Sequence, residues 1–183
     1  MSTSQWTFFM NIKTHLKQRH LNTNLHPTII DPNANTATFL LYNLSGQLTG
    51  YQFYNPQGSK KIFQDKLHSK YYTYRNKHYP TVTLWGIESL NSPHQPVFLT
   101  EGIFDAARMT SLNFSALATL TNDPPKDYIN FLLLLNRPII TVCDNDVAGR
   151  KLVKFGHYTE VPETDLGDAS EEYIQYLIKK YSS

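Results

Sequence analysis

The second half of the chain alternates short apolar runs with segments of helical character. The apolar runs predict strands over residues 97–100, 114–120, 138–143 and 157–161. The segments that follow them predict helices over residues 103–111, 124–135, 147–156 and 168–181. Asp123 followed by Pro124 is typical of a helix start and supports the second of these helices. Strands that alternate with helices usually pair in parallel, so we expect an α/β fold with a mostly parallel sheet flanked by helices.

The first half has a different pattern. Apolar and basic residues at helical spacing, Trp6 and Phe9 among them, predict an amphipathic helix over 5–21. The prolines and asparagines of 22–35 predict a loop or linker. Strands are expected over 36–42, 48–54 and 70–75, with Gly46 in the turn between the first two. These segments predict a small antiparallel or mixed β unit. The prolines of 93–96 mark its end, so we expect an N-terminal α+β subdomain over 1–95 and a second domain over 96–183.

The composition is that of a globular protein and excludes several classes. Of the 183 residues, 40% are hydrophobic and 17% are charged, which is not typical of a disordered chain. The single cysteine, Cys143, excludes an internal disulfide framework and a multi-cysteine zinc site, and its apolar surroundings predict a buried thiol. No apolar run is long enough to span a bilayer and no signal peptide is recognisable, so we expect a cytoplasmic protein without a membrane partner.

The charges are unevenly divided along the chain. Residues 1–100 contain nine Lys or Arg and three Asp or Glu, a net charge of +6. Residues 101–183 contain eight and twelve, a net charge of −4. The division indicates a polyanion partner for the basic half and a metal site in the acidic half.

Two acidic clusters directly follow two of the predicted parallel strands. The first is Glu101-Gly102-Ile103-Phe104-Asp105 and the second is Asp144-Asn145-Asp146-Val147-Ala148-Gly149. Ligands gather at the carboxyl ends of the strands in an open parallel sheet, so these carboxylates are expected to converge. Oxygen ligands of this kind suit Mg²⁺ held together with a substrate phosphate, which indicates phosphoryl-transfer or phosphodiester chemistry. The alternative, helix caps and a surface pair, has about equal weight for either cluster alone, whereas two clusters in order favour the metal site.

The two clusters resemble the motifs of the TOPRIM domain shared by topoisomerases, bacterial-type primases and certain nucleases. The matching positions are Glu101-Gly102-x-x-Asp105 and Asp144-x-Asp146-x-Ala148-Gly149-Arg150. Residues 115–121 are similar to the second strand and turn of primase TOPRIM domains, and residues 165–171 to their late acidic motif. Upstream, the segments 50–54, 70–75 and 84–90 are similar to the N-terminal part of DnaG-like and phage primase cores. The resemblance covers roughly residues 40 to 175.

The resemblance implies a role for each acidic position. Glu101 would be a metal ligand or a general acid–base, and Asp144 and Asp146 would bind Mg²⁺ or Mn²⁺. Asp105 and Asp168 would be further acidic ligands close to the metals. A pair of such metals can activate a 3′-hydroxyl and stabilise the leaving pyrophosphate. Gly102 and Gly149 would permit tight turns between strand and helix.

The sequence also departs from the primase pattern. Primases usually have glycine in the turn that reads Leu120-Thr121-Asn122 here, and a basic residue at Gly167. Ser170 stands where primases usually have the second aspartate of the late motif. These three departures would affect how tightly a second or third metal binds. We find no zinc-binding module, no helicase motif and, beyond 168–183, no helical subdomain after TOPRIM.

A basic and aromatic stretch covers residues 51–80. Its cations are Lys60, Lys61, Lys66, Lys70, Arg75 and Lys77, and its rings are Tyr51, Phe53, Tyr54, Phe63, Tyr71, Tyr72, Tyr74 and Tyr79. Cations that follow phosphates and rings that stack on bases are typical of proteins that bind single-stranded nucleic acid. The alternative is a half-buried sheet with a solvated lysine edge. The matching region of primases carries a basic ridge, and the resulting candidates are Lys60, Lys61, Lys70, Tyr72, Arg75 and, near the acidic cluster, Arg150.

The sequence therefore predicts a primase-like nucleotidyltransferase that acts on single-stranded DNA during DNA replication, with Mg²⁺ or Mn²⁺ as cofactor. Its compactness suggests a phage or another mobile element as its source. The expected partners are nucleoside triphosphates, single-stranded DNA and a helicase or other replication protein. Two alternatives stay open: a small TOPRIM nuclease, and a catalytically reduced nucleic-acid-binding protein in replication or its regulation.

Overall fold

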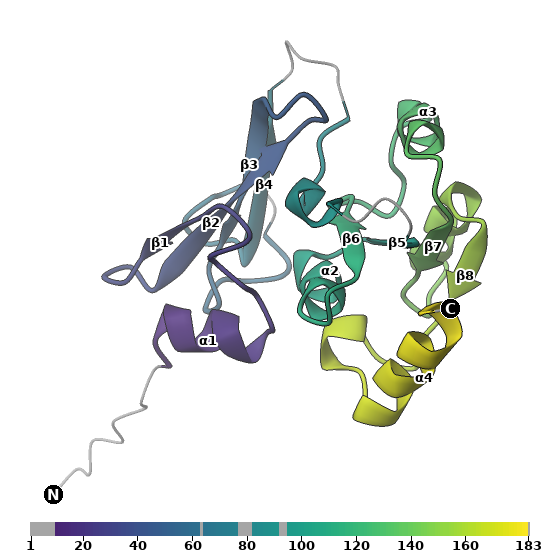
Figure 1. Cartoon of the computed structure of the whole chain (residues 1–183). Coiled ribbons are helices and arrows are strands. Elements are labelled where there is room, and N and C mark those ends of the chain that lie inside the picture. The colour runs from purple at the N-terminus through teal and green to yellow at the C-terminus, as the bar shows by residue number, and fades with distance from the viewer. Residues whose placement is uncertain (1–9, 63, 77–81, 92–94, 183) are drawn as a thin grey trace, which may run out of the picture.

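The computed structural model describes residues 10–62, 64–76, 82–91 and 95–182, and it contains two four-stranded sheets (Figure 1). The first sheet is antiparallel in the order β1-β2-β3-β4, and the second is parallel in the order β6-β5-β7-β8. The fold is therefore mixed α/β with a parallel sheet in the second half, as the alternation of strands and helices predicts. No helix within the described ranges is long and apolar enough to cross a membrane.

The parallel sheet is covered on both faces. Its strands are β5 (Val97–Thr100), β6 (Ser115–Ala118), β7 (Ile139–Val142) and β8 (Tyr158–Glu160). The α-helices of this half are α2 (Ile103–Thr110), α3 (Asp127–Leu134) and α4 (Glu171–Tyr181). Every residue of β5, β6 and β7 is buried, which is typical of parallel strands that carry helices on both sides. Leu99 and Leu117 pack with Phe131 of α3 on one face, and Phe98 packs with Phe114 on the other.

Two helices of this half differ from the prediction. The segment predicted as a helix over 147–156 is a 3₁₀ helix, η2 (Gly149–Phe155), and a second short one, η3 (Leu166–Asp168), precedes α4. The expected helix start at Asp123 is wrong, because α3 begins four residues later. Pro124 is followed by Pro125, and a residue before proline is disfavoured in helical geometry. Asp123 instead accepts a hydrogen bond of 2.6 Å from Lys154 Nζ.

The antiparallel sheet contains one strand that the sequence pattern did not predict. Its strands are β1 (Thr28–Asp31), β2 (Thr36–Tyr42), β3 (Leu48–Tyr54) and β4 (Tyr71–Arg75). The turn between β2 and β3 holds Gly46 at a φ of 72°, as expected for a turn glycine. The segment 22–35 was predicted as a loop, which is wrong for β1. Thr28, Ile29 and Ile30 are β-branched residues that favour a strand, but the run has only four residues among prolines and asparagines, and pairing with β2 holds it in the sheet.

The predicted helix over 5–21 is shorter in the structure. Helix α1 (Ile12–Gln18) begins after Asn11, whose side chain accepts a hydrogen bond from the Lys13 amide. It ends before His20, which has a φ of 60°. Residues 5–9, with Trp6 and Phe9, lie outside the described part of the chain, as do residues 92–94 of the expected domain boundary.

The antiparallel sheet packs one face against the second half of the chain. Phe39 and Tyr54 lie with their ring centroids 6.0 and 5.1 Å from that of Phe104 on α2, and Ile12 and Leu16 of α1 join the same core. Figure 1 shows α1 below this sheet and α2 beside it. The shared core fixes the first half of the chain against α2, the helix that carries Asp105 of the first acidic cluster.

Candidate active site

Two carboxylates leave neighbouring strands at the same edge of the parallel sheet. β5 and β7 pair in parallel, with Val97 opposite Ile139 and Leu99 opposite Thr141. Glu101 directly follows β5, and Asp144 is the second residue after β7. Burial and the negative charges of Asp144, Asp146 and Asp105 raise the pKa of Glu101. The structure therefore brings these carboxylates from the two clusters close enough to repel one another.

Asp105 is held in the first turn of α2 by its neighbours. Its Oδ1 accepts a hydrogen bond of 2.8 Å from the Gly167 amide. Burial, followed by the charges of Asp144 and Asp165, raises the pKa of Asp105 to about 6, although the Gly167 bond opposes the shift. A Cβ on Gly102 would lie 2.6 Å from Asp105 Oδ2, so glycine at this position leaves room for the carboxylate.

The second cluster forms a compact turn. The Asp146 amide donates to the Asp144 carbonyl at 2.8 Å, and the Gly149 amide donates to Asp146 Oδ1 at 2.6 Å. Asp146 thus caps the start of η2 with one carboxylate oxygen, as the helix-cap alternative anticipates. A Cβ on Gly149 would lie 2.7 to 2.9 Å from atoms of Asp144, so only glycine fits there without a shift. Burial and the charges of Asp165 and Asp146 raise the pKa of Asp144, and Lys60 opposes this shift.

The late acidic motif contributes a further residue to this group of carboxylates. This residue is Asp165, which was not among the candidate site residues. Asp165 lies immediately before η3, and its charge raises the pKa of both Asp105 and Asp144. The candidate from the same motif, Asp168, forms an ion pair with Arg19 at the end of α1. Both aspartates stand in the motif, and only the path of η3 shows which of them approaches the other carboxylates.

Leu120 adopts a backbone conformation that favours glycine. Its φ is 59°, in the left-handed region, and it lies in the turn where the primase resemblance expects glycine. Its amide donates to the Glu101 carbonyl at 2.9 Å, and the Thr119 amide donates to the Thr100 carbonyl at 3.0 Å. A left-handed L-residue costs about 1–2 kcal/mol, so this turn beside Glu101 is strained.

Cations lie opposite the carboxylates. Lys60 acts on the pKa of Asp144, and Arg19 acts on that of Asp105. Burial and the like charges of Lys60 and Arg19 lower the pKa of Lys70. The candidates Lys60 and Lys70 therefore share one cationic region with Arg19, whereas Lys61, exposed like its neighbour Lys60, acts on neither Asp144 nor Lys70. This region suits the phosphates of a nucleotide or nucleic acid.

The remaining candidates lie in different places. Arg75 Nη2 donates to the Thr119 carbonyl at 2.8 Å, so this guanidinium supports the strained turn beside Glu101. Arg150 is exposed on η2, with Nη2 3.5 Å from Asn145 Oδ1. Phe63, Lys77 and Tyr79 of the basic and aromatic stretch lie outside the described residues.

The sheet separates the aromatic side chains of this stretch. Tyr54 and Tyr71 face the second half of the chain, and burial raises the pKa of Tyr71 to about 12. Successive side chains of a strand point to opposite faces, so the outer face carries Tyr51, Phe53, Tyr72 and Tyr74. The ring contacts of Tyr51 with Tyr72 and Tyr74, at 6.5 and 5.4 Å, agree with this division. Tyr72 therefore lies on the side of the sheet that faces away from the carboxylates.

The donor set suits a hard divalent cation. It consists of carboxylate oxygens, and the mutual repulsion of Glu101, Asp105 and Asp144 would be relieved by a bound positive charge. Among the described residues, no three His, Cys, Asp or Glu side chains are arranged to hold a metal ion as they stand. Mg²⁺ usually needs only one or two carboxylates together with phosphate oxygens and water, so the residues present fit this cation.

No protein-family model matches the sequence. No curated protein matches it either. Solved structures do resemble it. A DnaG primase catalytic domain bound to single-stranded DNA aligns with a TM-score of 0.68 at 14% identity, over 97% of this chain and 76% of that one.

Two further structures agree with this likeness. A DnaG catalytic core aligns with a TM-score of 0.67 at 15% identity, over 91% of this chain and 72% of that one. The primase fragment of the bacteriophage T7 primase-helicase protein aligns with a TM-score of 0.52 at 12% identity, over 82% and 68%. The resemblance expected from the two acidic motifs is confirmed at the level of the fold: this chain has the fold of the DnaG primase catalytic core.

Proposed function

We propose that this protein is a primase-like nucleotidyltransferase that joins ribonucleotides on a single-stranded DNA template with Mg²⁺ or Mn²⁺. The observation that carries the proposal is the meeting of Glu101 and Asp144, from adjacent parallel strands, opposite a cationic region. The likeness to primase catalytic cores supports it, and one of those cores is bound to single-stranded DNA.

The acidic residues divide into two roles. Asp144 and Asp146 would hold the divalent cation, Asp146 through Oδ2, because its Oδ1 already caps η2. Asp105 and Asp165 would supply further negative charge near the metals, and Asp168 would hold Arg19 in place through their ion pair. Glu101, whose pKa is raised, would ligate the metal or accept the proton of the attacking 3′-hydroxyl. When bound, the divalent cation would stabilise the negative charge that develops on the transferred phosphoryl group.

The cationic region would bind the phosphates of the reactants. Lys60 and Lys70 approach the carboxylates from the segment that joins β3 to β4, and Arg19 approaches from the end of α1. A nucleoside triphosphate would lie between these cations and the metal. Lys61 and Arg150, both exposed, would contact template phosphates farther out. The T7 neighbour is part of a primase-helicase protein, so a helicase is the replication partner to test first.

Primer synthesis on single-stranded DNA tests the proposal. The wild-type protein, Asp144→Asn and Asp146→Asn are incubated with labelled ribonucleoside triphosphates and Mg²⁺ or Mn²⁺, and the products are separated by length. Asp127→Asn is the matched control, because Asp127 is an exposed aspartate at the start of α3. We expect primers from the wild-type protein and the control, and none above background from the other two variants.

Other outcomes would replace the proposal with one of its alternatives. Metal-dependent loss of the template without nucleoside triphosphates, abolished by Asp144→Asn, would identify a nuclease. Tight binding of DNA that survives Asp144→Asn, with no turnover under either metal, would identify a binding protein that lacks catalysis.

A further inference from the structure

Helix α1 carries charged residues on two opposite flanks. Ile12 and Leu16 are buried and point into the core. At 100° per residue, Arg19 lies on one flank of this buried stripe and Lys13 and Lys17 lie on the other. Arg19 pairs with Asp168 near the acidic cluster. Lys13 and Lys17 therefore face a different surface, and the proposed chemistry does not use them.

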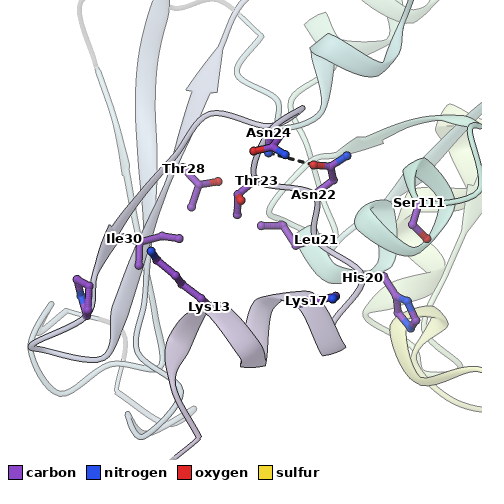
Figure 2. Close-up of a pocket in the computed structure, with 11 residues that line it drawn as sticks. Lys13, Lys17, His20, Leu21, Asn22, Thr23, Asn24, Thr28, Ile30 and Ser111 are labelled. Carbon is purple, nitrogen blue, oxygen red and sulfur yellow. Dashed lines mark hydrogen bonds between the residues drawn. The ribbon is translucent and has the colours of Figure 1, made fainter.

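That surface is a groove of about 850 Å³ between α1, β1 and the segment that joins them. Figure 2 shows Lys13 reaching from α1 toward Ile30 on β1, with Thr28 on the same strand and Ser111 across the groove. Ser111 directly follows α2, whose first residues lie beside Glu101. The eight residues of α2 span about 12 Å, so the groove is well separated from the carboxylates.

The charge of the groove is not neutralised. Within the described ranges, Lys13 and Lys17 form no ion pair, and no Asp or Glu lines the groove. His20 also lines it, in the left-handed conformation that ends α1, with its ring against Arg108. Two adjacent lysines without a counter-charge attract a ligand with several negative charges.

The polar lining indicates which anion fits. Asn22, Thr23 and Asn24 supply exposed hydrogen-bonding side chains, of the kind that contact the phosphates and sugars of nucleic acids. Among the residues that the structure describes, His20 is the only aromatic ring that lines the groove, so the lining favours contacts to the backbone of a nucleic acid over stacking on its bases. Lys13 and Lys17 are four residues apart, about 6 Å along the helix, which is close to the spacing of neighbouring phosphates in a nucleic-acid strand.

We propose that this groove binds the sugar–phosphate backbone of single-stranded DNA as a second contact, separate from the carboxylate site and independent of base sequence. The contact would hold the DNA strand about the length of α2 away from Glu101. It does not depend on the chemistry proposed for the carboxylates, because binding here requires no metal and no turnover.

Salt-dependent binding tests this proposal. The affinity of the protein for a labelled single-stranded oligonucleotide is measured by fluorescence anisotropy in chelator over a series of salt concentrations. The matched pair of variants is Lys13→Ala/Lys17→Ala and Lys126→Ala/Lys179→Ala, which remove the same charge. Lys126 and Lys179 are exposed, and neither forms an ion pair within the described ranges.

We expect the groove variant to bind at least about fivefold more weakly at low salt, with a salt slope reduced by about 1.4, which corresponds to two lost phosphate contacts. The variant Lys13→Arg/Lys17→Arg keeps both charges and should bind like the wild-type protein. Equal affinity and slope for the groove variant and its matched control would overturn the proposal. A groove variant that loses binding to vesicles of anionic lipid, with unchanged DNA affinity, would overturn the assignment to nucleic acid.

Discussion

The two sheets of this protein present their polar side chains in different ways. In the parallel sheet, β5 and β7 run in the same direction, so Glu101 and Asp144 leave at one edge and meet there. In the antiparallel sheet, neighbours in the sequence separate. Tyr71 faces the acidic cluster, whereas Tyr72 lies on the outer face beside Tyr51. Residues far apart in the sequence therefore meet at the ends of neighbouring parallel strands, whereas adjacent residues within one strand point to opposite faces of the sheet.

The difference has a consequence for mutations. At the edge of the parallel sheet, a few carboxylates act on one another, so each substitution there should change the charge of the whole cluster. Along β3 and β4, the effect of a substitution should depend on the face to which the side chain points.

The largest effect is expected for Asp144→Asn. The substitution keeps the size of the side chain and removes a charge that would hold the divalent cation, so primer synthesis should fall by at least about 100-fold. Steady-state rates of labelled ribonucleotide incorporation measure the effect. The same substitution at exposed Asp127 should change the rate by less than about twofold. Equal rates for Asp144→Asn and the wild-type protein would show that the carboxylate of Asp144 takes no part in the reaction.

Stability without metal should fall as the pH rises through the acidic range. The pKa of Asp105 is raised from 3.8 to about 6 in the folded protein, so the folded state binds the proton more tightly than the unfolded state does. Ionisation therefore destabilises the fold between about pH 4 and pH 6. Asp105→Asn removes this charge and can keep the hydrogen bond from Gly167, so it should stabilise the protein by about 1–3 kcal/mol at pH 7.

Urea denaturation in chelator, at several pH values, measures this effect. The wild-type protein should lose stability relative to Asp105→Asn as the pH rises, and the two should converge near pH 4. A difference between them that is constant with pH would mean that ionisation of Asp105 is not its cause. The charges of Asp144 and Asp165 would then act on Asp105 more weakly than their proximity indicates.

A smaller effect is expected at the strained turn beside Glu101. A protein with glycine at a given position is normally less stable than one with alanine there. At position 120 the φ of 59° favours glycine and reverses this order. Leu120→Gly and Leu120→Ala both lose the packing of the leucine side chain, and only glycine relieves the strain. We expect Leu120→Gly to be about 1 kcal/mol more stable than Leu120→Ala, measured by thermal or urea denaturation. The opposite order would show that the turn relaxes without glycine.

The sequence predicts the parallel half of this protein better than the antiparallel half, for physical reasons. Apolar runs such as 97–100 and 139–143 are buried on both faces, and the residues after them reach the same end of the sheet whatever the details of the helices. The choice between Asp165 and Asp168 is different, because it depends on the path of a three-residue 3₁₀ helix that local sequence does not determine. Arg19 becomes part of the site only through the packing of α1 against the second half of the chain.

The basic and aromatic stretch shows the same limit. Its composition indicates a β unit and cations for a polyanion, and the structure contains β3 and β4 where strands are expected. Composition alone cannot assign a face, since that depends on which side of the sheet meets another element. Tyr54 contacts Phe104, which shows which face of β3 points to the second half of the chain. Because side chains alternate along a strand and the register of β3 with β4 is fixed, this contact determines the face of the other side chains in both strands.

The smallest effect is expected for Tyr72→Leu, on the outer face. Leucine keeps much of the apolar surface, so the loss of stability should be under about 1 kcal/mol, the range of a cross-strand pair. Because Tyr72 faces away from the carboxylates, the affinity for single-stranded DNA should change by less than about twofold, less than the loss of one stacked base. The neighbouring substitution Tyr71→Leu is the matched control. It removes a ring stacked on Tyr54 at 5.2 Å on the inner face and should cost about 1 kcal/mol or more. A tenfold loss of DNA affinity in Tyr72→Leu, about 1.4 kcal/mol, would instead mean that the DNA strand crosses the outer face, and that the sheet does not divide the stretch by function.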